Sequence, residues 1–89
     1  MKTELYGSAT LPIDGGPEVI YSLLRDETGA IGRMQCELYG VRVEMEGESA
    51  SRPGLTASRA AIYRLLETLL NGTVPPIALD DVVEDWKSL

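Results

Sequence analysis

Histidine is absent from this chain of 89 residues, cysteine occurs once, and phenylalanine does not occur. Without histidine the chain has no imidazole, which excludes Ser-His-Asp catalysis, Cys-His catalysis and histidine-ligated zinc. The single cysteine, Cys36, excludes an intrachain disulfide and a cysteine-rich metal cluster, and it is typical of a reducing cytosol. We therefore expect no catalytic residue, no cofactor and no metal site.

Basic residues are scarce, because eight lysines and arginines stand against fourteen acidic residues and give a net charge of -6. Tight binding to nucleic acid requires clustered lysine and arginine, and anionic membranes attract the same residues. The chain also lacks a run of about 18 apolar residues, and residues 1–4 are not followed by the apolar segment of a signal peptide. These features predict a cytoplasmic protein that binds neither nucleic acid nor membranes.

Apolar residues recur at every second position in the first half of the chain and at helical spacing in the second half. This change predicts an α+β fold, a bent antiparallel sheet of three to four strands covered by one long and one short C-terminal helix. The whole chain, 1–89, is expected to be one domain. Its predicted segments are antiparallel strands with a hairpin over 1–46, a loop over 47–57, a helix over 58–71, a proline-containing connector over 72–78 and a short helix over 79–87.

The predicted hairpin follows a first strand over 4–12 and joins strands over 18–25 and 30–38. A three-residue loop at 27–29 places Asp26 opposite Ala30. The even-numbered residues then share a face that is almost wholly apolar, which we expect to be buried together with Cys36. The opposite, mixed face is expected to be open to a partner, and it carries Val19, Tyr21 and Leu23.

The apolar positions change from even to odd after Leu38. This change predicts a bulge or a sharp bend at Gly40. The segment that follows, over 47–57, is small and polar and is predicted to be a crossing loop, with a weak edge strand near 48–52.

The long helix has clear signals at both ends. Thr56 or Ser58 is the predicted N-cap, and Gly72 supplies a left-handed end after Asn71. In the connector, the two prolines exclude helix, because each removes a backbone donor. The short helix docks through an apolar stripe of Leu79, Val82, Val83 and Trp86.

Acidic residues are densest in the short helix, at Asp80, Asp81, Glu84 and Asp85. The first two lie in the first turn, where carboxylates cap free N–H groups, and this is the favoured interpretation. Docking to a basic partner and a metal site are the alternatives. Arg59, in the first turn of the long helix, is unfavourable there unless it meets an acid or an anion.

A tetrapeptide is repeated in the chain, because Glu-Leu-Tyr-Gly occurs at residues 4–7 and again at 37–40. A shared local geometry, with an aromatic residue before a glycine bend, is the favoured interpretation. A duplicated binding element is the alternative.

The second half combines three features: a leucine-rich helix from Ser58, a Thr-Val-Pro-Pro break at 73–76 and the ending Val-Val-Glu-Asp-Trp at 82–86. An upstream Tyr-Gly-Val step stands at 39–41. With these motifs the chain resembles a family of short Gram-positive bacterial proteins that is known as a domain of unknown function. Pro76 and Ala78 depart from the family pattern, in which one proline is followed by a capping threonine. The resemblance implies a small cytosolic bacterial protein and assigns no catalytic residue.

The small predicted core favours a non-enzymatic module that binds a protein partner or a second copy of itself, since such association supplies burial that a short chain lacks. A weak carboxylate-based metal binder or enzyme is the alternative, with Glu37, Glu44 or the acidic group at 80–85. The candidate interaction surface consists of Val19, Tyr21, Leu23, Arg59, Asp81, Glu84 and Asp85.

Overall fold

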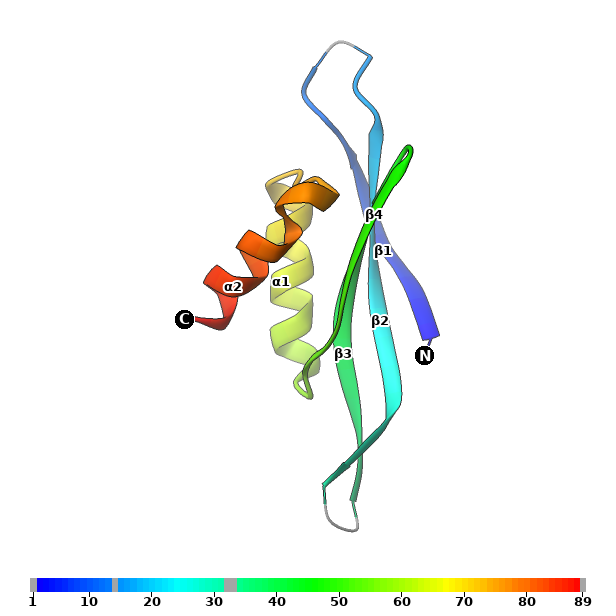
Figure 1. Cartoon of the computed structure of the whole chain (residues 1–89), viewed down its shortest axis with the longest axis vertical. Helices are drawn as coiled ribbons and strands as arrows, with labels where there is room; N and C mark the ends of the chain where they lie inside the picture. The colour runs from blue at the N-terminus through cyan, green and yellow to red at the C-terminus, as the bar shows by residue number, and fades with distance from the viewer. Residues whose placement is uncertain (1, 14, 32–33, 89) are drawn as a thin grey trace.

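A computed structural model of the chain describes residues 2–13, 15–31 and 34–88, and the side chains at 27–36 are outside this description. The order of the elements confirms the α+β prediction (Figure 1). The strands are β1 (Lys2–Thr10), β2 (Glu18–Ile31), β3 (Met34–Met45) and β4 (Glu48–Thr56), and the helices are α1 (Arg59–Asn71), the 3-10 turn η1 (Pro76–Ala78) and α2 (Leu79–Lys87).

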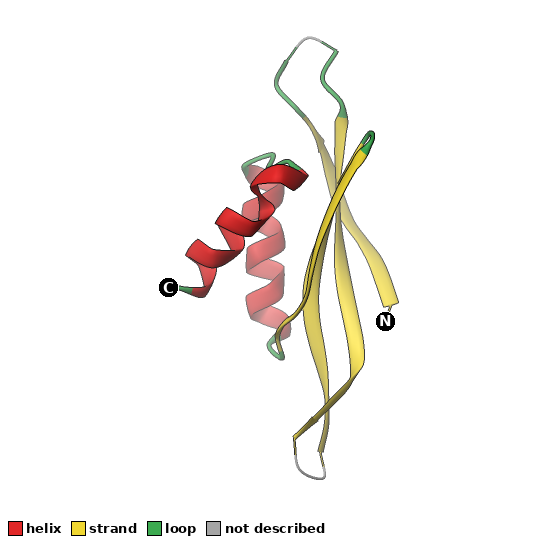
Figure 2. Ribbon diagram, in the orientation of Figure 1, coloured by secondary structure: helices red, strands yellow, loops and turns green. Residues whose placement is uncertain are grey.

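The four strands form one antiparallel sheet in the order β1-β2-β3-β4, so each strand pairs with its neighbour in the sequence. Both helices lie on the same face of this sheet (Figure 2). The molecule is long and narrow, about 52 × 26 × 18 Å, and the β2–β3 hairpin extends past the helices at one end (Figure 1). The architecture is therefore two layers, with an open sheet on one side and helices on the other.

The turn of the β2–β3 hairpin lies further along the chain than the sequence predicted. Asp26 pairs with Leu38 and not with Ala30, and the ladder continues until Ile31 pairs with Met34. The Asp-Glu-Thr-Gly segment, predicted as the turn, lies within β2 at a shift in the pairing register. The long pairing of 20–26 with 38–44 outweighs the local turn signal of this segment. Cys36 was predicted to lie on a buried face, and its side chain is among those outside the described residues.

The sheet face against the helices is the one predicted to be open. Val19, Tyr21 and Leu23 are buried, so they cannot form the surface that the sequence assigned to them. The new register places Tyr21 opposite Val43 and Leu23 opposite Val41, which unites the odd-numbered apolar residues of both strands. The core closes on this face through the buried side of α1, which consists of Ile62, Leu65, Leu66 and Leu69.

β4 is a full strand where the sequence predicted mainly a loop. Its polar serines pair with β3, because an edge strand with one exposed face needs few apolar residues. Between the pairs Tyr39–Thr56 and Val41–Arg52, β4 has two more residues than β3. The predicted irregularity at Gly40 is thus a bulge of β4, and a side chain at Gly40 would collide with the backbone of Arg52.

α1 begins as predicted, because the Ser58 hydroxyl accepts a hydrogen bond from the Ala61 N–H at 3.1 Å. Its end differs from the prediction, because Gly72 has helical torsion angles and the left-handed residue is Thr73, with φ of 46°. The Val74 N–H donates to the Leu69 carbonyl and the Thr73 N–H to the Leu70 carbonyl. This is the hydrogen-bond pattern of a Schellman end with threonine in the position that glycine prefers.

The connector to α2 is fixed to the sheet. The buried Tyr21 hydroxyl donates to the Val74 carbonyl at 2.9 Å, and burial raises the pKa of Tyr21 to about 12. Pro76 opens η1, in contrast to the prediction, because the first position of a helical turn needs no N–H donor. α2 has the predicted bounds, and its buried residues are Leu79 and Val83, with Trp86 half-buried beside the core.

Candidate functional site

The open face is the side of the sheet away from the helices, and the cross-strand pairs define it. No described helix or strand covers it (Figure 2). Its side chains lie in rows across the strands, and the two complete rows are Leu5, Ser22, Arg42 and Ser51, then Ser8, Ile20, Glu44 and Ser49. Leu5 is 73% exposed, and Arg42 forms an ion pair with Glu44 at 2.9 Å. The open face thus combines hydroxyl groups, one ion pair and isolated apolar groups.

The middle of the open face is shielded by its own side chains. Ser22 and Leu24 on β2 are each 4% exposed, although no other described element lies over them. The Nε atom of Arg42 is also shielded from solvent, and it has no hydrogen-bond partner within the described part of the chain. A surface that combines apolar and polar groups in this way suits contact with another folded surface.

A second polar group joins β1, β2 and β3 on the helix side of the sheet. Arg25 contacts Glu4 at 2.6 Å and Glu37 at 2.8 Å, and the Tyr39 hydroxyl donates to Glu37 at 2.7 Å. Arg59, on α1, lies over the Tyr39 ring at 6.0 Å from its centroid. Arg25 and Glu37 come from neighbouring strands, and Arg59 completes the group from the helical layer.

The Glu37 carboxylate of this group is held by donors, while the buried Nε atom of Arg25 has no hydrogen-bond partner among the described residues. The Tyr39 hydroxyl and then the Arg25 guanidinium hold the pKa of Glu37 below its ordinary value, and the charge of Arg59 adds to this. The hydrogen bonds from Arg25 to Glu37 and Glu4 raise the pKa of Arg25. A carboxylate held in its ionised form by donors is a poor proton acceptor, so this group offers no general base. Arg59 joins this group through the Tyr39 ring, and its charge acts on Glu37 without an ion pair being formed among the described contacts.

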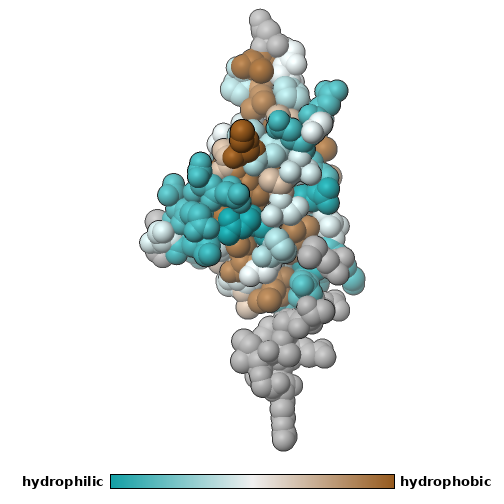
Figure 3. Space-filling view, viewed as in Figure 1, coloured by the Kyte–Doolittle hydropathy of each residue, from teal (hydrophilic) through white to brown (hydrophobic). Residues whose placement is uncertain are grey.

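The acidic residues of α2 have a different role from the capping that the sequence favoured. Ala78 is the N-cap, and no side chain of the described residues caps this end. Asp80 and Glu84 instead accept hydrogen bonds from Arg52 of β4, at 3.1 and 3.2 Å, which raises the pKa of Arg52. The outer side of α2 is strongly hydrophilic (Figure 3). Asp80 and Glu84 therefore join α2 to the sheet, whereas Asp81 and Asp85 are exposed to solvent.

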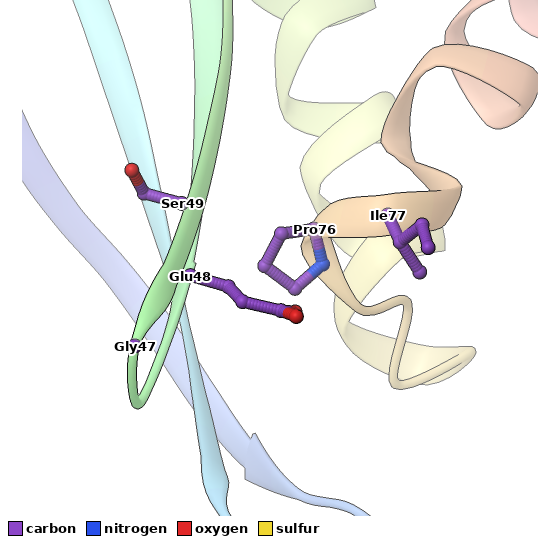
Figure 4. Close-up of a pocket in the computed structure, with 5 residues that line it drawn as sticks. All are labelled: Gly47, Glu48, Ser49, Pro76 and Ile77. Atoms are coloured by element: carbon purple, nitrogen blue, oxygen red, sulfur yellow. The ribbon is translucent and has the colours of Figure 1, made fainter.

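Two shallow pockets lie beside the helical layer. One, of about 380 Å³, is bordered by Gly47, Glu48 and Ser49 of the β3–β4 turn and by Pro76 and Ile77 of η1. The Glu48 side chain points toward Pro76 across this pocket, whereas Ser49 points away (Figure 4). The other, of about 260 Å³, is bordered by Thr68, Val82, Asp85 and Trp86. In the first pocket Ser49 turns away from Glu48, so these two side chains do not form a nucleophile–base pair.

The seven residues of the predicted interaction surface are not brought together. Three are buried beneath the helices, Arg59 lies over Tyr39, and Asp81, Glu84 and Asp85 are exposed on α2. Most carboxylates of the metal or enzyme alternative have arginine partners, since Glu44 pairs with Arg42, Glu37 with Arg25, and Asp80 and Glu84 with Arg52. Within the described residues, no three acidic or cysteine side chains form a group that could hold a metal ion.

The residues that the sequence missed are Leu5 and Arg42 of the open face. Their strands were predicted, but the face that each residue occupies depends on the β2–β3 register.

The helices of the described chain are too short or too polar to cross a membrane.

Comparison with protein families gives one match. The model of a family described as "Family of unknown function (DUF6514)" matches residues 9–89, nearly the entire chain. The chain belongs to this family. The matched residues include β2, β3, β4 and both helices. The family region of this chain therefore contains both layers of the fold, the sheet and the helices. A search of curated proteins found no match, and a search of solved structures found none.

Proposed function

We propose that this chain is a small, non-enzymatic, cytosolic interaction module that binds a protein partner through the open face of its sheet. The observation that carries the proposal is that both helices cover one face of the sheet and leave the other to solvent (Figure 2). Leu5, Ile20 and Leu38 supply apolar contact on that face, and the hydroxyl groups around Arg42 and Glu44 supply hydrogen bonds. A mixture of apolar and polar groups on an exposed surface is typical of a non-obligate protein interface.

The polar groups of the chain support a binding role in preference to catalysis. Glu37 and Glu44 are each held by an arginine, so neither is a free base for a reaction. Cys36 is the single thiol of the sequence, which favours a reducing compartment.

The test is affinity capture from a lysate of the source organism with matched variants. Ser49→Arg and Ser51→Arg place a large charged group on the open face at exposed positions of β4. Ala60→Arg makes a similar change at an exposed position of α1 and serves as the control. The wild type and the control should capture the same protein, and both open-face variants should lose it while their melting temperatures stay unchanged. Equal capture by all four proteins, or no specific capture by the wild type, would overturn the proposal.

A further inference from the structure

The two edges of the sheet differ in how well they are protected against pairing with another strand. β4 carries Pro53, which has no N–H donor, and its bulge next to Gly40 interrupts the regular spacing of its backbone groups. Arg52 also ties β4 to α2. Proline and bulges are the features by which edge strands avoid pairing with other chains. β4 is therefore a protected edge.

β1 is the unprotected edge. Among the described strands it pairs with β2 alone, so the backbone groups on its outer side have no partner strand. Its nine residues contain no proline, and its irregularity between Leu5 and Gly7 adds one residue, whereas the β4 bulge adds two. Leu5 is an exposed apolar residue on this strand, and an exposed apolar edge is a template for strand addition.

We infer that β1 pairs in antiparallel orientation with β1 of a second copy of this chain, and so extends the sheet across a two-fold axis. The pairing that places Leu5 opposite Leu5 of the second copy brings the two exposed apolar groups into contact at the axis. In this register Lys2 lies opposite Ser8 and Glu4 lies opposite Tyr6, so no charged residue faces a residue of the same charge.

Charge favours this edge as the place where two copies meet. The chain has a net charge of -6, so two copies repel each other over most of their surfaces. β1 contains one lysine and one glutamate, and Glu4 is already paired with Arg25. The dimer would join two open faces into one continuous face of eight strands, since each copy contributes four. This inference concerns the edge and stands apart from the proposed binding through the open face.

The test is sedimentation of the full chain over a range of concentrations, with a reducing agent that prevents a disulfide through Cys36. The wild-type mass should rise from 9.7 kDa toward twice that value as the concentration increases. Leu5→Lys places two like charges opposite each other and removes the apolar contact, so it should raise the dissociation constant roughly tenfold or more. Ile77→Lys makes the same change at a residue that is 85% exposed on η1, and it should dimerise as the wild type does.

Hydrogen exchange then separates edge pairing from other dimers. In the proposed dimer, amides of β1 should exchange more slowly at high concentration, while amides of β4 should not change. A wild type of 9.7 kDa at every concentration, equal dimerisation of the two lysine variants, or protection confined to β4 would each overturn the inference. A monomer that still captures its partner through Ser49 and Ser51 would overturn the self-pairing and leave the proposed function intact.

Discussion

Glu4 and Glu37, which begin the two copies of the Glu-Leu-Tyr-Gly repeat, bind the same guanidinium, that of Arg25. The first copy lies in β1 and the second in β3, and these strands flank β2 on either side. Register shifts occur between Leu5 and Gly7 in one copy and between Tyr39 and Val41 in the other. The extra residue is Tyr6 of the repeat itself in the first copy, but the extra residues belong to β4 in the second copy, where residues 39–41 pair regularly with β2. The repeat therefore lacks the shared local geometry that the sequence favoured, and it supplies the two acids of one ion-pair group.

The two acids should contribute unequally to the stability of this group. Glu37 is the less exposed of the two, with 31% of its side chain exposed against 46% for Glu4, and it also accepts a hydrogen bond from Tyr39. A double-mutant cycle of Arg25→Ala with Glu37→Gln should give a larger coupling energy than the cycle with Glu4→Gln, because solvent screens the outer pair more. Urea unfolding measures both cycles, and a larger coupling for Glu4 would contradict this geometry.

Acid should weaken the fold through Glu37. Its pKa is lower in the folded chain than in the unfolded chain, so its contribution to stability is complete above the ordinary glutamate value of about 4.3. That contribution is lost as the pH falls through the lower, folded value. Glu37→Gln should flatten the decline of the unfolding free energy below about pH 4. Tyr39→Phe removes the largest cause of the pKa shift of Glu37, so the same decline should be shallower in this variant than in the wild type. An unchanged acid profile in both variants would show that the group does not form.

Alkali should weaken the fold through Tyr21. Its pKa is raised to about 12 by burial, so its contribution is complete below the ordinary tyrosine value of about 10 and is lost as the pH rises toward 12. Tyr21→Phe should cost about 1 kcal/mol at neutral pH, since the hydrogen bond to Val74 is lost, and should remove this part of the alkaline decline. Tyr63→Phe, at an exposed side chain, is the control. Urea unfolding from pH 8 to pH 12 gives both profiles, and identical curves for Tyr21→Phe and the wild type would contradict the assignment.

Two leucines on opposite faces of the sheet test which face the helices cover. Leu23 is buried against the helical layer, whereas Leu5 is exposed on the open face. Leu23→Ala should lower the unfolding free energy by about 2–5 kcal/mol, and Leu5→Ala should change it by less than about 0.5 kcal/mol. Chemical denaturation measures both values. Similar losses in the two variants would mean that both faces are buried.

The sequence predicted the fold class, the start of α1 and the bounds of α2, but it assigned the faces of the hairpin wrongly. Val19, Tyr21 and Leu23 alternate with Ile20 and Leu24, so β2 is apolar on both faces and its own pattern cannot choose between them. The choice depends on which β3 residues lie opposite, and a turn placed at 27–29 keeps the buried pair of Val41 and Val43 away from β2. The side of a sheet that helices cover is a non-local property, which alternation within one strand does not determine.

The same limit applies to the candidate site. The sequence identified Arg59 and the α2 acids as notable charges, but their partners, Glu37 and Arg52, lie on other elements. The ion pairs of Arg52 and the effect of the Arg59 charge on Glu37 both follow from the packing of helices on the sheet. The sequence could therefore indicate that Arg59 needs an acid, and the fold was required to show which acid its charge acts on.

Thr73 offers a final test, because its left-handed torsion angle is unfavourable for a β-branched residue. Thr73→Gly removes this strain but adds freedom to the unfolded chain, and the balance should raise the unfolding free energy by about 1 kcal/mol. Thr73→Ala keeps a side chain at the same torsion angle, so it should give a clearly smaller gain. Thermal and urea unfolding of both variants provide the comparison. If alanine stabilises the chain as much as glycine does, the gain comes from losing the threonine side chain, and Thr73 is not the strained end of α1.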